Sequence, residues 1–201
     1  MICTPKKYWN NFYVSTNKII EPSNFAKFIK KKILNKNDII LDIATGNGRD
    51  AFYFSKFSKK VYGIDKSNVA INLSKEKAKN RKIKNLKFLN LSSERIKYFK
   101  RKKIKLLYAR FFIHAVNEKT EDKFFQDIKK HFDEKIKIAL EFRTTKDDLI
   151  KKGRKISKNE RVTSHYRRFI DLEKFEKKIK KLKFKVIYKN IGKSLSKTSE
   201  E

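Results

Sequence analysis

Short apolar runs alternate along this chain with longer segments in which apolar residues recur every three to four positions, and this alternation constrains the fold more than any other feature. The pattern of a buried strand occurs at 39–43, 60–65, 86–89, 104–109, 136–142 and 184–188. Amphipathic helices are predicted over about 49–57, 67–79 and 118–132, with two more beginning after Pro22 and Asp171. Such alternation is typical of an α/β fold with a mostly parallel sheet and helices on both faces. The 201 residues suit a single domain.

The net charge of +32 is the most extreme property of the composition. Forty-four of the 54 basic residues are lysines, and they are spread over every segment. This even spread favours a solvated surface over a nucleic-acid site, although the charge alone permits either. The single cysteine, Cys3, excludes an intrachain disulfide and indicates a cytoplasmic protein. No apolar run approaches the roughly 18 residues that span a bilayer, and the first residues lack a signal-peptide core.

Arginine is scarce, and its positions are therefore informative. Five of the ten arginines lie between 143 and 168, in a polar connection that is long for a compact domain. The planar, bidentate guanidinium is preferred where carboxylates or phosphates are bound. This connection, 143–170, is a candidate anion-binding insertion, and the alternative is a solvated basic loop.

The strand at 39–43 leads into the loop Ala44-Thr45-Gly46-Asn47-Gly48, and a helix follows. Glycines in such a turn let the backbone approach a ligand closely. Asp65 ends the next strand, where a carboxylate can accept both hydroxyls of a ribose. The glycine spacing also fits a dinucleotide fingerprint, but that register places Asp42 inside a buried strand, where an unpaired charge is costly. A strand–helix turn without a ligand is the remaining alternative.

With these motifs the sequence resembles the class I S-adenosylmethionine-dependent methyltransferases, a Rossmann-like family. The resemblance spans about 8–190. Besides the loop it rests on five motifs: Tyr8-Trp9-x-x-Phe12-Tyr13, Gly63-Ile64-Asp65-x-Ser67, Arg110-Phe111-Phe112-x-His114-Ala115, Glu141-Phe142-Arg143-x-Thr145-Lys146-Asp147 and His165-Tyr166-Arg167-Arg168-Phe169. It is closest to a bacterial subgroup of small-molecule methyltransferases often found near surface-polysaccharide (capsule) genes.

The resemblance implies a division of the single domain, 1–201. Residues 1–35 form an N-terminal helical cap, 36–142 the cofactor-binding core, 143–170 a substrate-loop insertion, and 171–201 a C-terminal helix, strand and tail. S-adenosyl-L-methionine is the implied cofactor, and no metal is implied. The residues expected to bind the cofactor are Asp42, Ala44, Gly46, Gly48, Asp65, Ser92 and Arg110.

Two of these positions depart from the family pattern. Ala44 replaces the first glycine of the loop, and this is tolerable only if its φ stays negative. Ser92 replaces the aspartate that usually faces the adenine amine, so adenine recognition is expected to be weaker or made by backbone groups.

Residues that follow the fourth and fifth strands are expected to face the transferring methyl group. His114 and Glu141 are the candidate catalytic residues. The alternatives are that His114 holds its loop through a backbone hydrogen bond and that Glu141 orients Arg143 or His165. The expected substrate-binding residues are Arg143, His165, Tyr166, Arg167 and Arg168. Tyr8, Trp9 and Tyr13 are expected either to cover the cofactor or only to pack the first helix.

The expected function is methyl transfer to an oxygen or nitrogen of a small anionic metabolite that is phosphorylated, carboxylated or sugar-linked. One alternative is an RNA or DNA methyltransferase. That class is favoured only by charge, because the Asn/Asp-Pro-Pro-aromatic and Pro-Cys motifs are absent. The other is a non-catalytic relic that binds the cofactor or a partner. The sequence does not specify an oligomeric state.

The C-terminus gives the last expectation. The family usually ends with a strand that inserts antiparallel between the fifth and sixth strands. Residues 193–201 show no strand pattern. The last strand is therefore expected to be missing or incomplete, as in a truncated chain, with a gap between the fifth strand and the strand at 184–188.

Overall fold

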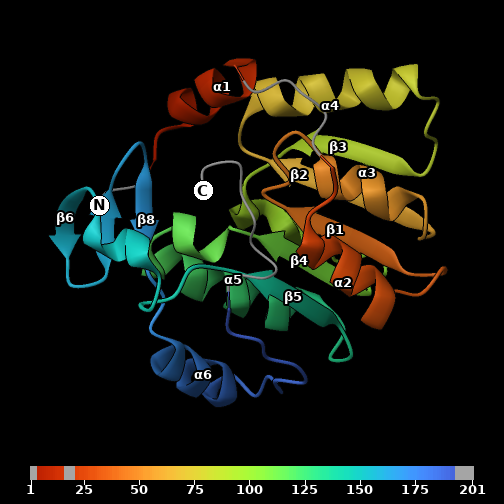
Figure 1. The fold of residues 1–201 in the computed structure, drawn as a ribbon. Coiled ribbons are helices and arrows are strands. Elements are labelled where there is room, and N and C mark those ends of the chain that lie inside the picture. The colour runs from red at the N-terminus through yellow and green to blue at the C-terminus, as the bar shows by residue number, and fades with distance from the viewer. Residues whose placement is uncertain (1–3, 16–20, 193–201) are drawn as a thin grey trace.

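The computed structural model describes residues 4–15 and 21–192. Five parallel strands form the central sheet in the order β3-β2-β1-β4-β5 (Figure 1). Their bounds are Ile39–Ile43 (β1), Lys60–Asp65 (β2), Leu86–Asn90 (β3), Leu106–Arg110 (β4) and Lys137–Glu141 (β5). The chain builds outward from β1 to β3 and then returns to β4. The strand order thus reverses between β1 and β4, and ligands bind at such a point, beyond the carboxyl ends of the strands.

Helices cover both faces of this sheet, which confirms the predicted fold class. The helices are Lys6–Ser15 (α1), Asn24–Lys32 (α2), Arg49–Ser55 (α3), Asn68–Asn80 (α4), Glu118–His131 (α5) and Leu172–Lys181 (α6), with 3-10 turns Ser93–Phe99 (η1), Ile113–Ala115 (η2) and Asp148–Lys151 (η3). One core packs α2, α3 and α4 on the sheet, and the other packs η1, α5 and α6 on its opposite face. Successive residues such as Ile40 and Leu41 enter opposite cores, as the strand period of two requires.

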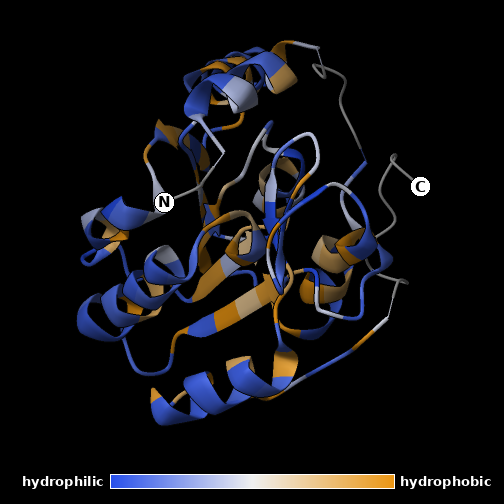
Figure 2. Ribbon diagram, turned by 90° about the vertical axis from the view of Figure 1, so that its left-hand side faces the viewer, coloured by the Kyte–Doolittle hydropathy of each residue, from blue (hydrophilic) through white to orange (hydrophobic). Residues whose placement is uncertain are grey.

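Helices α2, α4, α5 and α6 begin where the sequence predicts, because polar caps satisfy their first free N–H groups. Ser23, Ser67, Asn117 and Asp171 each accept a hydrogen bond from a backbone N–H three residues later. Apolar residues lie on the strands and on the helix sides that face them, while the outer helix faces are hydrophilic (Figure 2). No helix within the described ranges is long and apolar enough to cross a membrane.

The connection 143–170 is more regular than the sequence indicates. It contains a three-stranded antiparallel sheet of Arg154–Ser157 (β6), Glu160–Val162 (β7) and Tyr166–Arg168 (β8). These strands are three or four residues long and rich in charge, so they carry no apolar alternation that a sequence pattern would reveal. The bridge between Thr144 and Ile170 closes the base of this insertion.

The predicted strand at 184–188 is wrong. These residues form no strand, and β5 is an outer strand of the described sheet. Side-chain packing holds the segment instead, since Phe184 lies 5.9 Å from Phe125 and Tyr188 lies 4.7 Å from Phe28, ring centre to ring centre. The apolar pattern therefore reflects partial packing without a backbone partner. Residues 193–201, to which the expectation of a missing last strand refers, lie outside the described ranges.

Candidate functional site

The loop after β1 turns sharply through left-handed backbone conformations. Gly46 and Gly48 have φ of 56° and 76°, and Gly48 is the N-cap of α3. Ala44 has φ of 56° as well, which contradicts the expectation that this residue keeps a negative φ. The loop thus retains the glycine conformation at a position without glycine, which costs an L-residue about 1 kcal/mol or more. Ala44 is exposed, so its methyl group has room.

Asp65 joins this loop to the end of β2. Its Oδ2 accepts the Gly46 N–H at 2.9 Å, and its Oδ1 accepts the Ser67 N–H at 2.8 Å. Burial raises the pKa of Asp65 against these hydrogen bonds. Each carboxylate oxygen has a second lone pair, so both can still accept a hydroxyl of a bound ligand.

Asp42 is the penultimate residue of β1. Its side chain is buried and accepts the Thr45 hydroxyl at 2.6 Å. Burial raises the pKa of Asp42 well above its usual value, and Asp50 and Asp65 add to the increase. A buried carboxylate among other carboxylates is stabilised by a cation. The sulfonium and amino groups of S-adenosylmethionine supply that charge, so the residues of the loop fit this cofactor.

Helix α1 lies over the loop. Its Tyr13 approaches so closely that a Cβ at Gly46 would lie 2.3 Å from the Tyr13 hydroxyl. Burial raises the pKa of Tyr13, and the nearby carboxylates of Asp65 and Asp42 raise it further. Asn10 of the same helix accepts the Ser67 hydroxyl at 2.8 Å. The absence of a side chain at Gly46 thus provides space that Tyr13 enters from above.

Ser92 is the residue that the sequence analysis expects to face the adenine of the cofactor. Ser92 is half-buried, precedes η1, and makes no side-chain capping bond. Asn90, which the sequence analysis did not single out, donates from Nδ2 to the Asp65 carbonyl at 2.9 Å. Its place directly beside Asp65 in the β2–β3 register is visible only once the strands are paired.

Arg110 and Glu141 form an ion pair across the ends of β4 and β5, with 2.6 Å between Nε and Oε2. The Arg110 guanidinium also lies 4.1 Å from the centre of the Phe111 ring. Burial raises the pKa of Glu141 to about 7, although Arg110 opposes the increase. The partner of Glu141 is therefore Arg110, and not Arg143 or His165 as the orienting alternative required.

His114 is buried in η2, and its Nδ1 accepts the backbone N–H of Arg143 at 3.2 Å. Burial lowers the pKa of His114 well below 6.5, and the charges of Arg143 and Arg167 add to the effect. The ring is therefore neutral, and because Nδ1 accepts, Nε2 carries the proton. This contact fits the alternative in which His114 holds its loop through a backbone hydrogen bond.

Two cationic side chains, Arg143 and Arg167, and the neutral ring of His165 lie near this histidine. Arg143 pairs with Asp147 at 2.7 Å, and buried Arg167 donates to the Thr163 hydroxyl. Burial lowers the pKa of His165 to about 4, and both arginines contribute. The Tyr8 hydroxyl lies 3.1 Å from Nδ1 of His165, so α1 also contacts the insertion 143–170.

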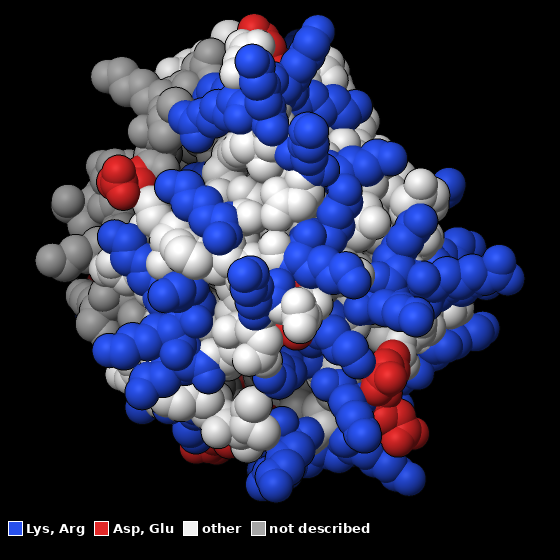
Figure 3. Space-filling view, turned by 90° about the vertical axis from the view of Figure 1, so that its right-hand side faces the viewer, with Lys and Arg blue, Asp and Glu red and all other residues white. Residues whose placement is uncertain are grey.

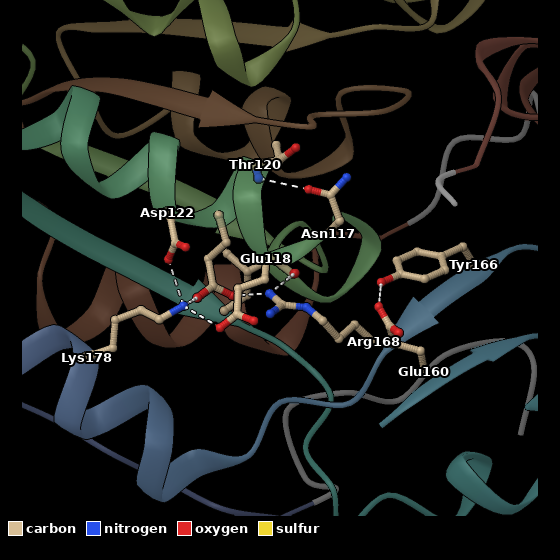
Figure 4. A network of polar contacts seen from close by, with 10 residues as sticks. Asn117, Glu118, Thr120, Asp122, Glu160, Tyr166, Arg168 and Lys178 are labelled. Carbon is tan, nitrogen blue, oxygen red and sulfur yellow. Dashed lines mark hydrogen bonds and ion pairs between the residues drawn. The ribbon is translucent and has the colours of Figure 1, made fainter. Parts of the chain in front are cut away.

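Arg168 and Tyr166 turn away from this group. The Arg168 guanidinium pairs with Glu121, which is 1% exposed, and donates to the Ile113 carbonyl at 3.3 Å. Lys178 of α6 also pairs with the Glu121 carboxylate, at 2.8 Å (Figure 4). The same ammonium group pairs with Glu118 and Asp122. Although burial opposes it, these carboxylates raise the pKa of Lys178. The Tyr166 hydroxyl donates to Glu160 within the small sheet.

Sequence reasoning missed a buried network beneath the loop. Asp50 accepts hydrogen bonds from the Ser23 backbone at 2.8 Å, the Ser23 hydroxyl at 2.7 Å and the Tyr108 hydroxyl at 2.7 Å. It joins α2, α3 and β4 at the point where α3 begins. A charged residue in the first helical turn is ordinarily read as a partner for the helix dipole, so the sequence gives no sign of this role.

A groove of about 1320 Å³ follows β5 toward the insertion. Phe111, Glu141, Arg143 and Arg167 line its inner part. The Gly46 loop does not contribute to its lining. The Gly46 loop follows β1 and Arg143 follows β5, so both lie on the carboxyl edge of the sheet, where the Arg110–Glu141 pair joins the ends of β4 and β5.

The comparisons with known proteins agree with this geometry. A sequence profile described as "Methyltransferase domain" matches residues 34–194. No curated protein sequence matches the chain. Among solved structures, a SAM-dependent methyltransferase from Aquifex aeolicus has 22% identity and a TM-score of 0.55, covering 72% of this chain and 77% of its own.

Two further structures extend the comparison. The phosphoethanolamine N-methyltransferase 1 of Haemonchus contortus has 14% identity and a TM-score of 0.63, covering 85% of this chain and 38% of its own. The [4+2]-cyclase SpnF has 12% identity and a TM-score of 0.70, covering 94% and 75%. At these identities the likeness establishes the fold. The profile covers most of the chain, and the protein belongs to the methyltransferase domain family, whose enzymes use S-adenosyl-L-methionine.

Proposed function

We infer that the protein transfers a methyl group to an oxygen or nitrogen of a small anionic metabolite. The observation that carries this proposal is the group formed by His114, Arg143, His165 and Arg167. Burial is the largest cause of the low pKa of both histidines, and the charges of Arg143 and Arg167 lower it further, so the two guanidinium groups act on the same small space. A phosphate or carboxylate bound there relieves this repulsion, and arginine presents the forked donors that such anions accept.

The cofactor side of the proposal rests on the loop. S-adenosylmethionine supplies the electrophilic methyl group when bound. Asp42 faces its cationic end, Asp65 accepts the ribose hydroxyls, and Ala44, Gly46 and Gly48 leave the backbone open to it. Ser92 lies on the adenine side, and Arg110 fixes the position of Glu141.

Glu141 is the proton acceptor in this proposal. With a pKa of about 7, about half of the carboxyl groups are ionised at neutral pH, which suits a general base. The acceptor hydroxyl or amine would give its proton to the Glu141 carboxylate as its oxygen or nitrogen bonds to the methyl carbon, and the electron pair of the broken carbon–sulfur bond would stay on the sulfur of the departing S-adenosylhomocysteine. His114 carries its proton on Nε2, because its Nδ1 accepts the backbone N–H of Arg143. A role for His114 as the base would require the other tautomer.

The comparisons support a small anionic substrate without specifying it. One neighbour was solved with phosphoethanolamine and S-adenosylhomocysteine, whereas another is a cyclase, so the fold is compatible with different chemistry. We extend the proposal to the substrate-loop role of 143–170, to a cytoplasmic location, and to the subgroup found near surface-polysaccharide genes. The loop role rests on the arginine cluster, the location on the single cysteine, and the subgroup on the sequence motifs.

The test is cofactor turnover against a panel of phosphorylated and carboxylated metabolites, before and after nuclease treatment. We expect turnover on a metabolite to be unaffected by nuclease. Arg143→Lys and Arg167→Lys should each raise KM about tenfold or more, because a point cation cannot replace a fork. Arg154→Lys, at an exposed position of the insertion, is the matched control. Turnover that disappears with nuclease, or equal KM in all three variants, would contradict the proposal.

A further inference from the structure

Lysines that are dispersed along the sequence meet on one edge of the folded protein. Each strand of the central sheet is preceded by a basic segment. These five segments, 30–38, 56–60, 79–87, 100–105 and 129–137, are called the basic edge. They hold 21 of the 54 basic residues but three of the 22 acidic ones. Twenty of the 21 side chains are exposed, and that of Lys60 is half-buried.

Hydrogen bonds between the segments show that they form one continuous surface. The Lys59 N–H donates to the Asp38 carbonyl and the Lys137 N–H to the Lys105 carbonyl, both at 3.0 Å. Lys60 Nζ donates to the Lys84 carbonyl and Lys137 Nζ to the Ile33 carbonyl, both at 3.3 Å, so all five segments are connected. The connections into the strands lie on the right-hand side of Figure 1, and Figure 3 shows that Lys and Arg cover most of that face with few acidic groups between them.

The opposite edge of the same sheet lacks this charge. The segments that follow the five strands, 44–49, 66–68, 91–95, 110–117 and 142–147, hold six basic and two acidic residues. Helix dipoles favour cations at helix C-termini, which also lie on the basic edge. That effect reaches only the last turn of each helix. It does not explain the run of five cations over 100–105, which lies between η1 and β4.

We propose that the basic edge is a docking surface for the phosphate backbone of a nucleic acid. A broad array of exposed cations with few acids matches a polyanion, whose binding is driven by release of condensed counterions. An anionic membrane is the competing partner, but membrane-surface binding usually adds apolar side chains. The large exposed apolar residues in the described part of the chain are Val14, Tyr98, Val186, Ile187, Tyr188 and Ile191, and none lies in these segments.

This surface is distinct from the methyl-transfer site. The basic edge and the Gly46 loop lie at opposite ends of the strands, and a five-residue strand spans about 17 Å. A nucleic acid on the basic edge therefore lies away from Glu141 and His114. The basic edge thus holds a phosphate backbone away from these residues and serves to tether the enzyme, and the proposal stands independently of the metabolite substrate.

The experiment compares two variants of equal charge. The edge variant replaces one lysine in each segment with glutamine, at Lys36, Lys59, Lys84, Lys102 and Lys135. The matched variant makes the same change at five exposed lysines elsewhere, Lys152, Lys155, Lys158, Lys174 and Lys177. Affinity for a short fluorescent RNA and a short DNA duplex is measured by anisotropy over a range of KCl concentrations, with phosphatidylserine vesicles as the alternative partner.

We expect the edge variant to bind both nucleic acids about tenfold more weakly, and the matched variant to bind like the wild type. For the duplex, the slope of log affinity against log salt should fall by about 0.9 for each phosphate that the edge variant no longer neutralises. Cofactor affinity, measured by calorimetry, should be equal in both variants. An equal loss of nucleic-acid affinity in the two variants would show that only the net charge matters, and this would overturn the proposal. So would a wild-type protein that binds the vesicles but neither nucleic acid.

Discussion

At the scale of single residues, Ala44 shows most directly how this chain departs from the glycine-rich loop of its family. Its φ of 56° places an L-residue in the left-handed region. Ala44→Gly should raise the free energy of unfolding by about 1 kcal/mol, because glycine adopts this conformation without steric cost. Chemical denaturation measures the change. The control is Ala51→Gly within α3, which should lower stability; a decrease in both variants would refute the strain at Ala44.

Glu141 is the second residue with a measurable signature. The proposed base must be ionised, so kcat/KM should rise as pH increases through about 7. Glu141→Gln should lower activity and remove this limb of the profile. Glu118→Gln, at an exposed carboxylate of α5, should leave it in place. A limb that persists in Glu141→Gln would assign the titration to another group.

The raised pKa of Glu141 makes stability fall with increasing pH, whereas the proposed activity rises. The pKa of Glu141 is about 7 in the folded protein against 4.5 for the free side chain, so the fold favours the protonated form. This contribution to stability is fully present below about pH 4.5 and is lost as the pH rises through about 7. The enzyme thus gains an ionised base at the pH at which this carboxyl ceases to stabilise it.

At the scale of elements, α1 connects the two halves of the site. Tyr13 lies against Gly46, and Tyr8 contacts His165. Since the Tyr13 hydroxyl enters the space in front of the loop, the Tyr13 side chain must move before a cofactor can occupy that space. Tyr13→Ala should therefore speed cofactor association in stopped-flow fluorescence. Tyr98→Ala, at an exposed tyrosine of η1, is the control. An unchanged association rate in Tyr13→Ala would show that α1 does not limit access.

The insertion is joined to α5 and α6 by the network around Glu121. Arg168→Ala should lower the unfolding free energy by about 3 kcal/mol, because it leaves a buried carboxylate with one cation fewer. The variant's KM should stay unchanged. Arg154→Ala, an exposed arginine of β6, should be neutral in both measurements. A higher KM without a decrease in stability would instead give Arg168 the substrate-binding role that the sequence predicts.

At the scale of the whole molecule, the charge acts on the fold itself. Twenty-one cations on one edge repel one another, and salt screens this repulsion over about 10 Å at 0.1 M and about 3 Å at 1 M. Thermal stability should therefore rise between 0.1 and 1 M KCl. The edge variant should unfold at a higher temperature than the matched variant in low salt, and the two should converge in high salt. A difference that persists at 1 M KCl would point to a cause other than repulsion.

The amino-acid sequence was sufficient to predict the α/β fold and the five parallel strands of the sheet. It was also sufficient to predict the loop 44–48 that follows β1. These features depend on local patterns of apolar residues, caps and glycines, which act over a few positions. The side-chain partners emerged only from the folded chain: Arg110 for Glu141, Glu121 for Arg168 and Tyr13 for Gly46. So did the irregular path of 184–188, since a strand needs a neighbour that its own residues cannot specify. The same reason applies to the lysines of the basic edge, which occur in five separate segments of the chain. The parallel topology gathers these segments on one edge, because every connection into a strand ends there.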